Sequence, residues 1–535
     1  MGGYKVILHL DLDAFYAQVE HRRLGIDRSV PLAVQQWAGL IAVNYAARSR
    51  GVGRFCDIQE AKSRCPDLKL VHVETIGNTS DGRMGGVAAN KATSKACLNR
   101  YRSASTEVLK AMQRFSDVLL IERASIDEWY IDATALVEER LEGVEEGGSC
   151  SLDWRESHVC KGASLNASLD CDVRLIVGAK LCKEIRDAVK AETEYEMSAG
   201  ISHNKMLSKL ASAMNKPNMQ TIVPSSAVEA LMDLDYTEIN GLGGKLGEKL
   251  KTLYPNLKTS RDLQTIGQED LARSLGQKTG AWIHALCRGE VDEPVKPNLL
   301  PKSLNACKSF PASPIEQVHK WLLILAEELA DRIEQDRQDF ARMPRFLVLH
   351  ARGAVHFRDH SSQSPMPKSA TRDRLYEVGL KLFEKIQGEC LPCSRLALGA
   401  NSFVFDQKDM KKMDTYFVAS ASEPGNSGAL GKRKNIGTSA LVEKKKGKAQ
   451  CKPFFAPAAP SKQPGGCRAT ESEGEGSRDG IDLNAVDISQ QKYILSMIKG
   501  AQGPAANSSA SKRKSSGGQS NLGQFFATRS SSQDL

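Results

Sequence analysis

Three acidic residues at the ends of two apolar runs are the part of this sequence best suited to chemistry. Asp11 follows the run Val6–Leu10, and Asp127 and Glu128 follow the run Val118–Ile126. Each run predicts a buried strand. Because a carboxylate is costly to bury unless it is paired or binds a metal ion, these acids predict a site for two divalent cations. When the 126–128 segment is taken alone, the alternative of solvated acids at a strand end is the favoured interpretation.

The local geometry restricts how these carboxylates can meet. Adjacent side chains of a regular strand point to opposite faces, so Asp127 and Glu128 cannot both face one metal pair from within a strand. At a hairpin end, or where the strand twists, both can converge beside Asp11. Two Mg²⁺ ions about 4 Å apart would then activate an attacking hydroxyl and hold a leaving pyrophosphate.

Basic residues elsewhere in the chain could hold the phosphates of such a substrate. Tyr45, Arg48, Arg50 and Arg54 follow a short strand-like run, and Lys216 supplies a point charge suited to phosphate. Arginines spaced in this way also occur on solvated helix faces, so the run alone leaves both interpretations open.

The elements that must position these residues alternate in type up to about Asp406. We expect strands at 40–45 and 196–202 and helices at 15–23, 103–115 and 177–193. Segment 136–169 is polar and rich in glycine, which predicts a loop insertion. Residues 224–294 predict a helical region. A separate α+β domain is expected for residues 303–405, with a helix at 316–337 and strands at 345–350 and 395–398.

Composition and charge limit the classes of protein that this chain can be. Its 535 residues predict several domains, and the net charge of +9 falls in the polar tail after residue 406. No apolar run approaches the roughly 20 residues that span a bilayer, and no signal peptide is visible, so we expect an intracellular protein that does not contact membranes. Cys390 and Cys393 form one isolated CxxC motif, read either as a structural zinc site or as reduced, buried thiols.

Several motifs together resemble the Y family of translesion DNA polymerases, and its eta branch most closely. The resemblance covers about residues 5–406, in the family's order. The motifs are Asp11–Tyr16, Tyr45–Arg54, Tyr101–Ser105, Glu122–Glu128, Ala199–Lys205, Leu242–Gly247, Trp282–Gly289, Pro294–Pro297 and Leu300–Lys302.

The resemblance implies an α+β multidomain fold shaped as a right-hand polymerase, with an added little finger and a disordered C-terminal tail. Its domains would be the palm at 1–16 and 76–223, the fingers at 17–75, the thumb at 224–297, the little finger at 298–406 and the tail at 407–535.

The resemblance also implies a role for individual residues. The metal ligands would be Asp11, Asp127 and Glu128, assisted by the Leu12 carbonyl. Tyr16 would be the steric gate that rejects a ribose 2′-hydroxyl. Contacts to the incoming nucleotide and its templating base would come from Gln36, Tyr45, Arg48, Arg54 and Lys216.

This chain departs from the family at two positions. Trp129 follows the Asp-Glu pair where the family usually has a small residue, so we expect altered packing beneath the metal ions. The loop Gln36–Gly39 is short, which leaves the neighbours of Gln36 undefined.

Two segments are candidates for gripping the DNA duplex. Ile239–Lys245 predicts a helix-hairpin-helix element in which Gly241, Gly243 and Lys245 approach a phosphate, although an ordinary glycine turn has the same pattern. In the little finger, alternating basic residues either face DNA or form a solvated sheet face. They are His350, Arg352, His356 and Arg358.

The tail carries motifs typical of partner binding. Residues 519–526 predict a sliding-clamp box, in which Gln519, Leu522, Phe525 and Phe526 would enter a clamp pocket. A looser version spans Met413–Phe417. Residues 480–498 contain an amphipathic helix pattern, and since no histidine follows His360, we expect a zinc-free ubiquitin-binding helix as a hypothesis. Three basic runs resemble nuclear localisation signals.

We therefore predict a nuclear, monomeric DNA-directed DNA polymerase that uses two Mg²⁺ ions, with Mn²⁺ as an alternative, to extend primer-template DNA with dNTPs. Resemblance to the eta branch implies synthesis past ultraviolet-induced thymine dimers. The alternatives are another Y-family branch with a different lesion preference and a non-catalytic replication-fork scaffold.

Overall fold

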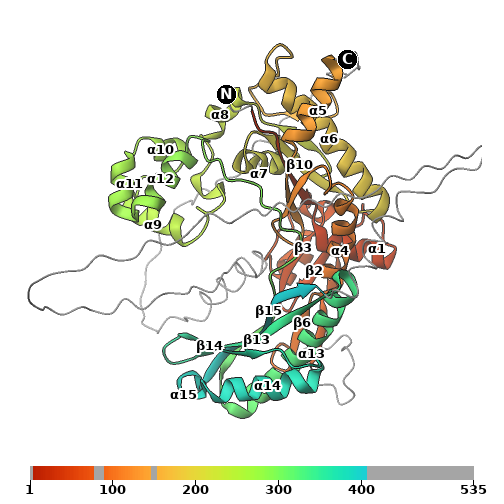
Figure 1. The fold of residues 1–535 in the computed structure, drawn as a ribbon, viewed down its shortest axis with the longest axis vertical. Coiled ribbons are helices and arrows are strands. Elements are labelled where there is room, and N and C mark those ends of the chain that lie inside the picture. Colours follow the sequence, from red (N-terminus) through yellow and green to blue (C-terminus); the bar gives the residue numbers. More distant parts are fainter. Residues whose placement is uncertain (1–3, 78–89, 146–153, 406–535) are drawn as a thin grey trace, which may run out of the picture. The chain divides into compact units, whose positions relative to one another are not determined.

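A six-stranded sheet forms the centre of the N-terminal half (Figure 1). The computed structural model describes residues 4–77, 90–145 and 154–405. The sheet has the order β7-β8-β1-β10-β11-β9, and its central strand β1 pairs antiparallel with both neighbours. The strands are β1 (Ile7–Leu12), β7 (Leu120–Arg123), β8 (Glu128–Asp132), β9 (His158–Val159), β10 (Met197–Ser202) and β11 (Gln220–Ile222).

The alternation of apolar and polar residues along β1 gives the sheet two different faces. Leu8, Leu10 and Leu12 belong to the main hydrophobic core with residues of α4 (Asn99–Gln113) and α6 (Asp170–Thr193). His9 and Asp11 therefore point to the opposite face. Helix α7 (Lys205–Met214) contacts β1 and β10, and a hydrogen bond of 2.7 Å joins Ser212 of this helix to His9.

A smaller three-stranded sheet carries the basic run that follows the first helix. Its strands are β2 (Leu32–Gln36), β3 (Gly39–Val43) and β4 (Lys69–His72), and helices α1 (Phe15–Leu24), α2 (Tyr45–Arg48) and α3 (Ile58–Arg64) accompany them. Residues of β2, β3, α2 and α3 form a separate small core. The hairpin of β5 (Glu74–Gly77) and β6 (Ser94–Cys97) follows.

Residues 225–286 are helical, as the sequence predicts, and have a core of their own. The elements are η1 (Ser225–Ala227), α8 (Val228–Leu231), η2 (Tyr236–Glu238), α9 (Lys245–Leu253), α10 (Ser260–Gln264), α11 (Gln268–Leu275) and α12 (Gln277–Leu286).

The C-terminal described segment is the α+β domain that the sequence predicts. Four antiparallel strands are ordered β12-β15-β13-β14, and α13 and α14 pack against the sheet in a separate core. The elements are β12 (Ser303–Ser313), α13 (Ile315–Phe340), β13 (Arg342–Gly353), β14 (Asp359–Pro365), α14 (Arg372–Glu384), α15 (Gln387–Cys390) and β15 (Cys393–Phe405). Cys390 and Cys393 are buried here, and burial raises the pKa of Cys390 to about 11, which favours the protonated thiol.

Three local expectations are wrong. Segment 136–169 is not simply a loop, because α5 (Thr134–Glu145) forms where Val137 and Leu141 pack on the main core. The second acidic strand is shorter than 118–126 and ends at Arg123. His356 and Arg358 do not continue a strand with His350 and Arg352, since residues 354–358 connect β13 to β14.

No helix in the described ranges is both long and apolar enough to cross a bilayer.

Candidate active site

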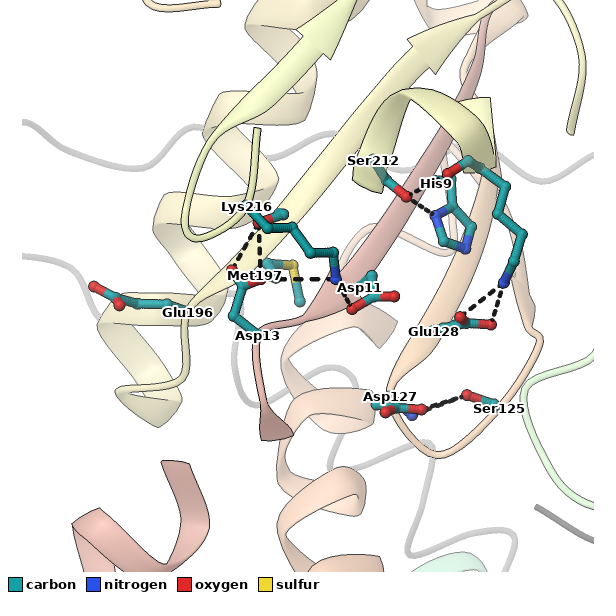
Figure 2. Close-up of polar contacts among 12 residues, drawn as sticks. His9, Asp11, Asp13, Ser125, Asp127, Glu128, Glu196, Met197, Ser212 and Lys216 are labelled. Carbon is teal, nitrogen blue, oxygen red and sulfur yellow. Dashed lines mark hydrogen bonds and ion pairs between the residues drawn. The ribbon is translucent and has the colours of Figure 1, made fainter. Parts of the chain in front are cut away.

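The turn between β7 and β8 brings the three predicted carboxylates together (Figure 2). The backbone N–H groups of Ala124 and Ser125 both donate to the Glu128 carbonyl, at 3.0 and 3.2 Å, which closes a tight hairpin. Glu128 is then the cross-strand partner of Asp11, and the Leu12 N–H donates to the Asp127 carbonyl at 2.9 Å. This arrangement resolves the strand-face problem, because Asp127 lies in the turn and only Glu128 lies in the strand.

Two lysine ammonium groups offset part of the negative charge of this cluster. Lys209 on α7 lies 2.7 Å from each carboxylate oxygen of Glu128, and Lys216 forms an ion pair with Asp11. The Asp127 carboxylate accepts a hydrogen bond of 2.6 Å from the Ser125 hydroxyl. Burial, followed by the charges of Lys209 and Lys216, lowers the pKa of His9 well below its usual value, so this imidazole is neutral.

The donor set suits hard divalent cations. Three carboxylates at the ends of adjacent strands, together with the Leu12 backbone carbonyl, are oxygen ligands of the kind that Mg²⁺ prefers. As the side chains stand, no three or more potential metal ligands in the described part of the chain enclose a common point. The ammonium groups of Lys209 and Lys216 already place positive charge beside Glu128 and Asp11. The oxygen donors therefore fit a metal site on condition that Asp11 and Glu128 turn from their lysines, and Asp127 from Ser125.

A fourth acidic residue, Asp13, lies beside this cluster and was not among the predicted site residues. Its carboxylate is 3 % exposed and accepts hydrogen bonds from the Ser198 hydroxyl and the Asn218 N–H. The hydroxyl of Tyr45 donates to it at 3.3 Å. The sequence shows two aspartates, Asp11 and Asp13, separated by one residue. That spacing does not distinguish a metal ligand from a buried carboxylate that is hydrogen-bonded within the protein.

The predicted nucleotide contacts separate into two groups. Tyr45 begins α2, which the Asn44 side chain caps by accepting from the Ala47 N–H at 3.0 Å, and the Arg48 guanidinium lies 4.7 Å from the Tyr45 ring centre. Burial, and then the Asp13 charge, raises the pKa of Tyr45. Tyr45 and Lys216 both approach Asp13.

The other two predicted contacts lie apart from the cluster. Arg54 is exposed, with its guanidinium 5.2 Å from the Phe55 ring centre, and Gln36 ends β2 opposite Gly39. Neither has a polar contact with the three carboxylates in the described residues.

Tyr16 is held by an aromatic stack. Its ring lies parallel to that of Tyr101, with centroids 4.1 Å apart and an interplanar angle of 13°. The Tyr101 hydroxyl donates to buried Glu20 at 2.8 Å, and Arg100 also contacts this carboxylate at 2.9 Å. Tyr16 therefore packs on Tyr101, which is itself fixed by the buried carboxylate of Glu20.

The predicted phosphate-binding turn has the backbone that glycine permits. Gly241 has a φ of +93°, and a Cβ there would lie 2.9 Å from the Trp282 ring. Lys245 is the first residue of α9, so the N-terminal N–H groups of that helix follow the turn. The clamp box at 519–526, the 413–417 segment and the 480–498 helix lie outside the described residues.

Three models of known protein families match this chain. The model described as "impB/mucB/samB family" matches residues 10–213, and its "C-terminal domain" matches residues 301–414. Between them, the model described as "DNA polymerase-iota, thumb domain" matches residues 237–291.

Individual relatives cover the same region. The chain is 34% identical to DNA polymerase eta of Arabidopsis thaliana over 86% of its own length and 67% of that protein. It is 36% identical to DNA polymerase eta of Drosophila melanogaster over 64% of its length and 42% of that protein. With "N-acetyltransferase eso1" of Schizosaccharomyces pombe the identity is 33%, over 78% of this chain and 51% of the relative. The chain thus spans about half the length of the last two relatives.

Proposed function

Because this chain belongs to the Y family of translesion DNA polymerases, we propose that it extends DNA primers on damaged templates in the manner of the eta branch. The observation that carries the proposal is the β7–β8 hairpin, which places Asp127 and Glu128 beside Asp11 at the ends of paired strands. Cations are needed to offset the mutual repulsion of these carboxylates and the cost of burying them.

We assign the domains by matching them to the separate cores. The palm (1–16 and 76–223) would contain the six-stranded sheet, and the fingers (17–75) the three-stranded sheet. The thumb (224–297) would contain the helical core and the little finger (298–406) the four-stranded sheet. Two of these four assignments, the thumb and the little finger, have a matching family model over nearly the same residues, and one model at 10–213 spans the palm and the fingers together.

Asp11, Asp127 and Glu128, with the Leu12 carbonyl, would hold two Mg²⁺ ions. When bound, the ions would favour the primer hydroxylate and neutralise charge on the departing pyrophosphate. Lys216 would leave Asp11 and bind a phosphate oxygen, and Tyr45 and Arg48 would bind the triphosphate from the fingers side. The ring of Tyr16 would contact the sugar face and exclude a 2′-hydroxyl.

The eta assignment implies that the site accepts a cis-syn thymine dimer. Two of the reported relatives carry the name eta, which supports this branch. A second candidate is another Y-family branch with a different lesion preference, which the match to an iota thumb favours.

Primer extension tests both candidates. Wild type, Asp127→Ala and Asp117→Ala would be assayed with Mg²⁺ on undamaged and thymine-dimer templates. Asp117 is an exposed acid before β7 and serves as the matched control. We expect wild type and Asp117→Ala to insert two adenines opposite the dimer and continue, and Asp127→Ala to lose roughly 100-fold or more in rate.

Each other outcome has a defined meaning. Extension of the undamaged template alone would retain the polymerase and reject the eta branch. Failure of wild type on both templates would reject catalysis and favour a replication-fork scaffold.

The tail would direct this enzyme to replication forks in the nucleus. We infer a sliding-clamp contact from Gln519, Leu522, Phe525 and Phe526, and a ubiquitin contact from residues 480–498. Titration of the full chain with the clamp should show binding that Phe525→Ala/Phe526→Ala abolishes while primer extension without clamp is unchanged. Absence of ubiquitin-induced shifts in a 478–500 peptide would reject the second contact.

A further inference from the structure

Asp13 is a buried anion whose hydrogen-bonding capacity is used within the protein. The Ser198 hydroxyl lies 2.9 and 2.7 Å from its two carboxylate oxygens, and the Asn218 N–H donates to Oδ2 at 2.8 Å. Tyr45 donates to Oδ1 at 3.3 Å, and the Lys216 ammonium lies 3.7 Å from the same oxygen. With these partners, Asp13 faces protein donors rather than the space between Asp11 and Glu128 (Figure 2).

The donors come from segments far apart in the chain. Ser198 belongs to β10, Asn218 to the loop after α7, and Tyr45 to α2 beyond the small sheet. Because a buried carboxylate must keep its hydrogen bonds, the three segments are held at fixed distances from one point. Two of these segments carry a residue proposed to bind the triphosphate.

The loop that contains Lys216 is fixed from its other side as well. Asn218 adopts a left-handed backbone with a φ of +53°, and its side-chain oxygen accepts from the Arg186 guanidinium at 3.0 Å. Arg186 is itself buried and donates to the Met197 carbonyl at 2.9 Å. The loop is therefore held between Arg186 of α6 and the carboxylate of Asp13.

The backbone of Asp13 is equally constrained. The Gln18 side chain donates to the Asp13 carbonyl at 2.6 Å and to the Glu196 carbonyl at 2.8 Å. The Asp13 N–H donates to the Glu196 carbonyl at 3.1 Å. The anchor thus has a fixed position relative to β1, whose Asp11 belongs to the carboxylate cluster.

We propose that Asp13 is a positioning residue that aligns the Tyr45 hydroxyl and the Lys216 ammonium on the triphosphate of the incoming nucleotide. The inference rests on the proposed polymerase function. It assigns to Asp13 a task different from metal binding: joining the fingers contact and the palm contact at one buried charge. A nucleotide would then meet the Tyr45 hydroxyl already in place and the Lys216 loop already fixed, with only the Lys216 side chain left to turn from Asp11, which lowers the ordering cost of binding.

The test is steady-state and pre-steady-state kinetics of Asp13→Asn on an undamaged primer-template. The variant keeps the size of the side chain but removes the charge that attracts Lys216, and it leaves one amide oxygen for the donors that share two carboxylate oxygens in the wild type. A hydrogen bond to a charged group contributes about 1.5–3 kcal/mol, which corresponds to roughly a 10–100-fold rise in KM for dNTP. We expect a smaller change in kcat and an unchanged Kd for primer-template DNA, with Asp117→Ala behaving as wild type.

A double-mutant cycle separates positioning from a general structural role. If Asp13 acts through Tyr45, then Tyr45→Phe should raise KM in the wild-type background and have less effect in the Asp13→Asn background. Additive effects would overturn the inference, as would a loss confined to kcat with KM for dNTP unchanged.

If Asp13→Asn does not fold, Ser198→Ala removes one donor to the same carboxylate, and it should raise KM for dNTP a few-fold without weakening DNA binding. No change in KM with that variant would also overturn the inference. Failure of wild type to extend any primer would reject the polymerase function instead.

Discussion

At the scale of single residues, the proposed sugar selection would depend on how firmly one aromatic ring is supported. Tyr16 is buried and stacked on Tyr101, whose hydroxyl donates to the buried carboxylate of Glu20. A ring that cannot move aside can exclude a hydroxyl group by contact alone. The phenol oxygen of Tyr16 is not needed for this task.

Two substitutions at this position test the support. Tyr16→Ala removes the ring, and we expect the ratio of kcat/KM for ribonucleotides to that for deoxyribonucleotides to rise roughly 10–100-fold. Tyr16→Phe keeps the stack and should retain wild-type selection. Single-nucleotide insertion with each nucleotide type measures both ratios. Equal selectivity of wild type and Tyr16→Ala would show that another group excludes the ribose.

Trp129 is a second residue whose role depends on its direction. It follows Glu128 in β8, so its side chain points to the opposite face of the sheet, where it is fully buried in the main core; its cross-strand partner is Leu10. The indole ring does not point at the carboxylates, although its N–H has no hydrogen-bond partner among the described residues. Trp129 is therefore expected to affect stability more than chemistry.

Trp129→Ala should lower the free energy of unfolding by about 3–5 kcal/mol. Trp129→Phe retains most of the buried ring and removes the unpaired donor, so the loss should be below about 2 kcal/mol. Urea unfolding measures both values. At a temperature where Trp129→Phe is folded, primer extension should match wild type; inactivity of that folded variant would revive the scaffold interpretation.

At the scale of elements, the site depends on how closely α7 lies on the sheet. Gly200 of β10 faces this helix, and a Cβ atom there would lie 1.9 Å from the Ser208 carbonyl oxygen and 2.5 Å from the Ser212 nitrogen. Only glycine permits this approach. The helix in turn carries Lys209 to Glu128 and precedes the loop of Lys216.

Gly200→Ala should therefore displace α7 as a whole. We expect a loss of stability of about 3 kcal/mol or more, together with a defect in primer extension, because both lysines move with the helix. Gly388→Ala is the matched control, since a Cβ there meets nothing within 4 Å. Thermal unfolding and extension assays compare the two variants. A fully stable and active Gly200→Ala would show that the helix can shift without cost.

At the scale of the whole molecule, a buried ion pair joins the four-stranded domain to the β5–β6 hairpin. Glu328 of α13 is 1 % exposed and lies 2.5 Å from the Lys95 ammonium of β6, with Arg102 at 3.8 Å. Burial alone would raise the pKa of Glu328, but the charges of Lys95 and Arg102 outweigh it and the net pKa is lowered. The contribution is therefore present above the ordinary value of 4.5 and is lost as the pH falls through the lowered pKa.

Removing one partner should be worse than removing both. Lys95→Met leaves a buried carboxylate with less compensation and should cost about 3–5 kcal/mol, whereas Lys95→Met/Glu328→Leu should recover much of that loss. Hydrogen exchange of the β6 and α13 segments at pH 7 measures the local opening. Equal protection in wild type and Lys95→Met would show that other contacts, such as Lys308 with the Ser94 carbonyl at 2.7 Å, suffice.

The sequence by itself determined most of the elements and the choice of the three cluster carboxylates. The alternation of leucines with His9 and Asp11 decides which face of β1 is buried, because successive strand residues point to opposite sides. The order of the motifs identified the family, because each motif is a short segment whose residues act together. Such short-range relations can be recognised in the sequence alone.

Only the tertiary structure decided how the carboxylates are supported. The helix α5 depends on packing against a core that a polar, glycine-rich stretch does not reveal. Lys209 and Asp13 acquire their roles from partners more than 80 and 180 residues away in the chain, respectively. Such distances are set by how the sheet, α7 and α2 pack together, and no local spacing encodes them. The sequence therefore identified the carboxylates of the candidate site, and tertiary packing set the positions of the lysines and of Asp13 around them.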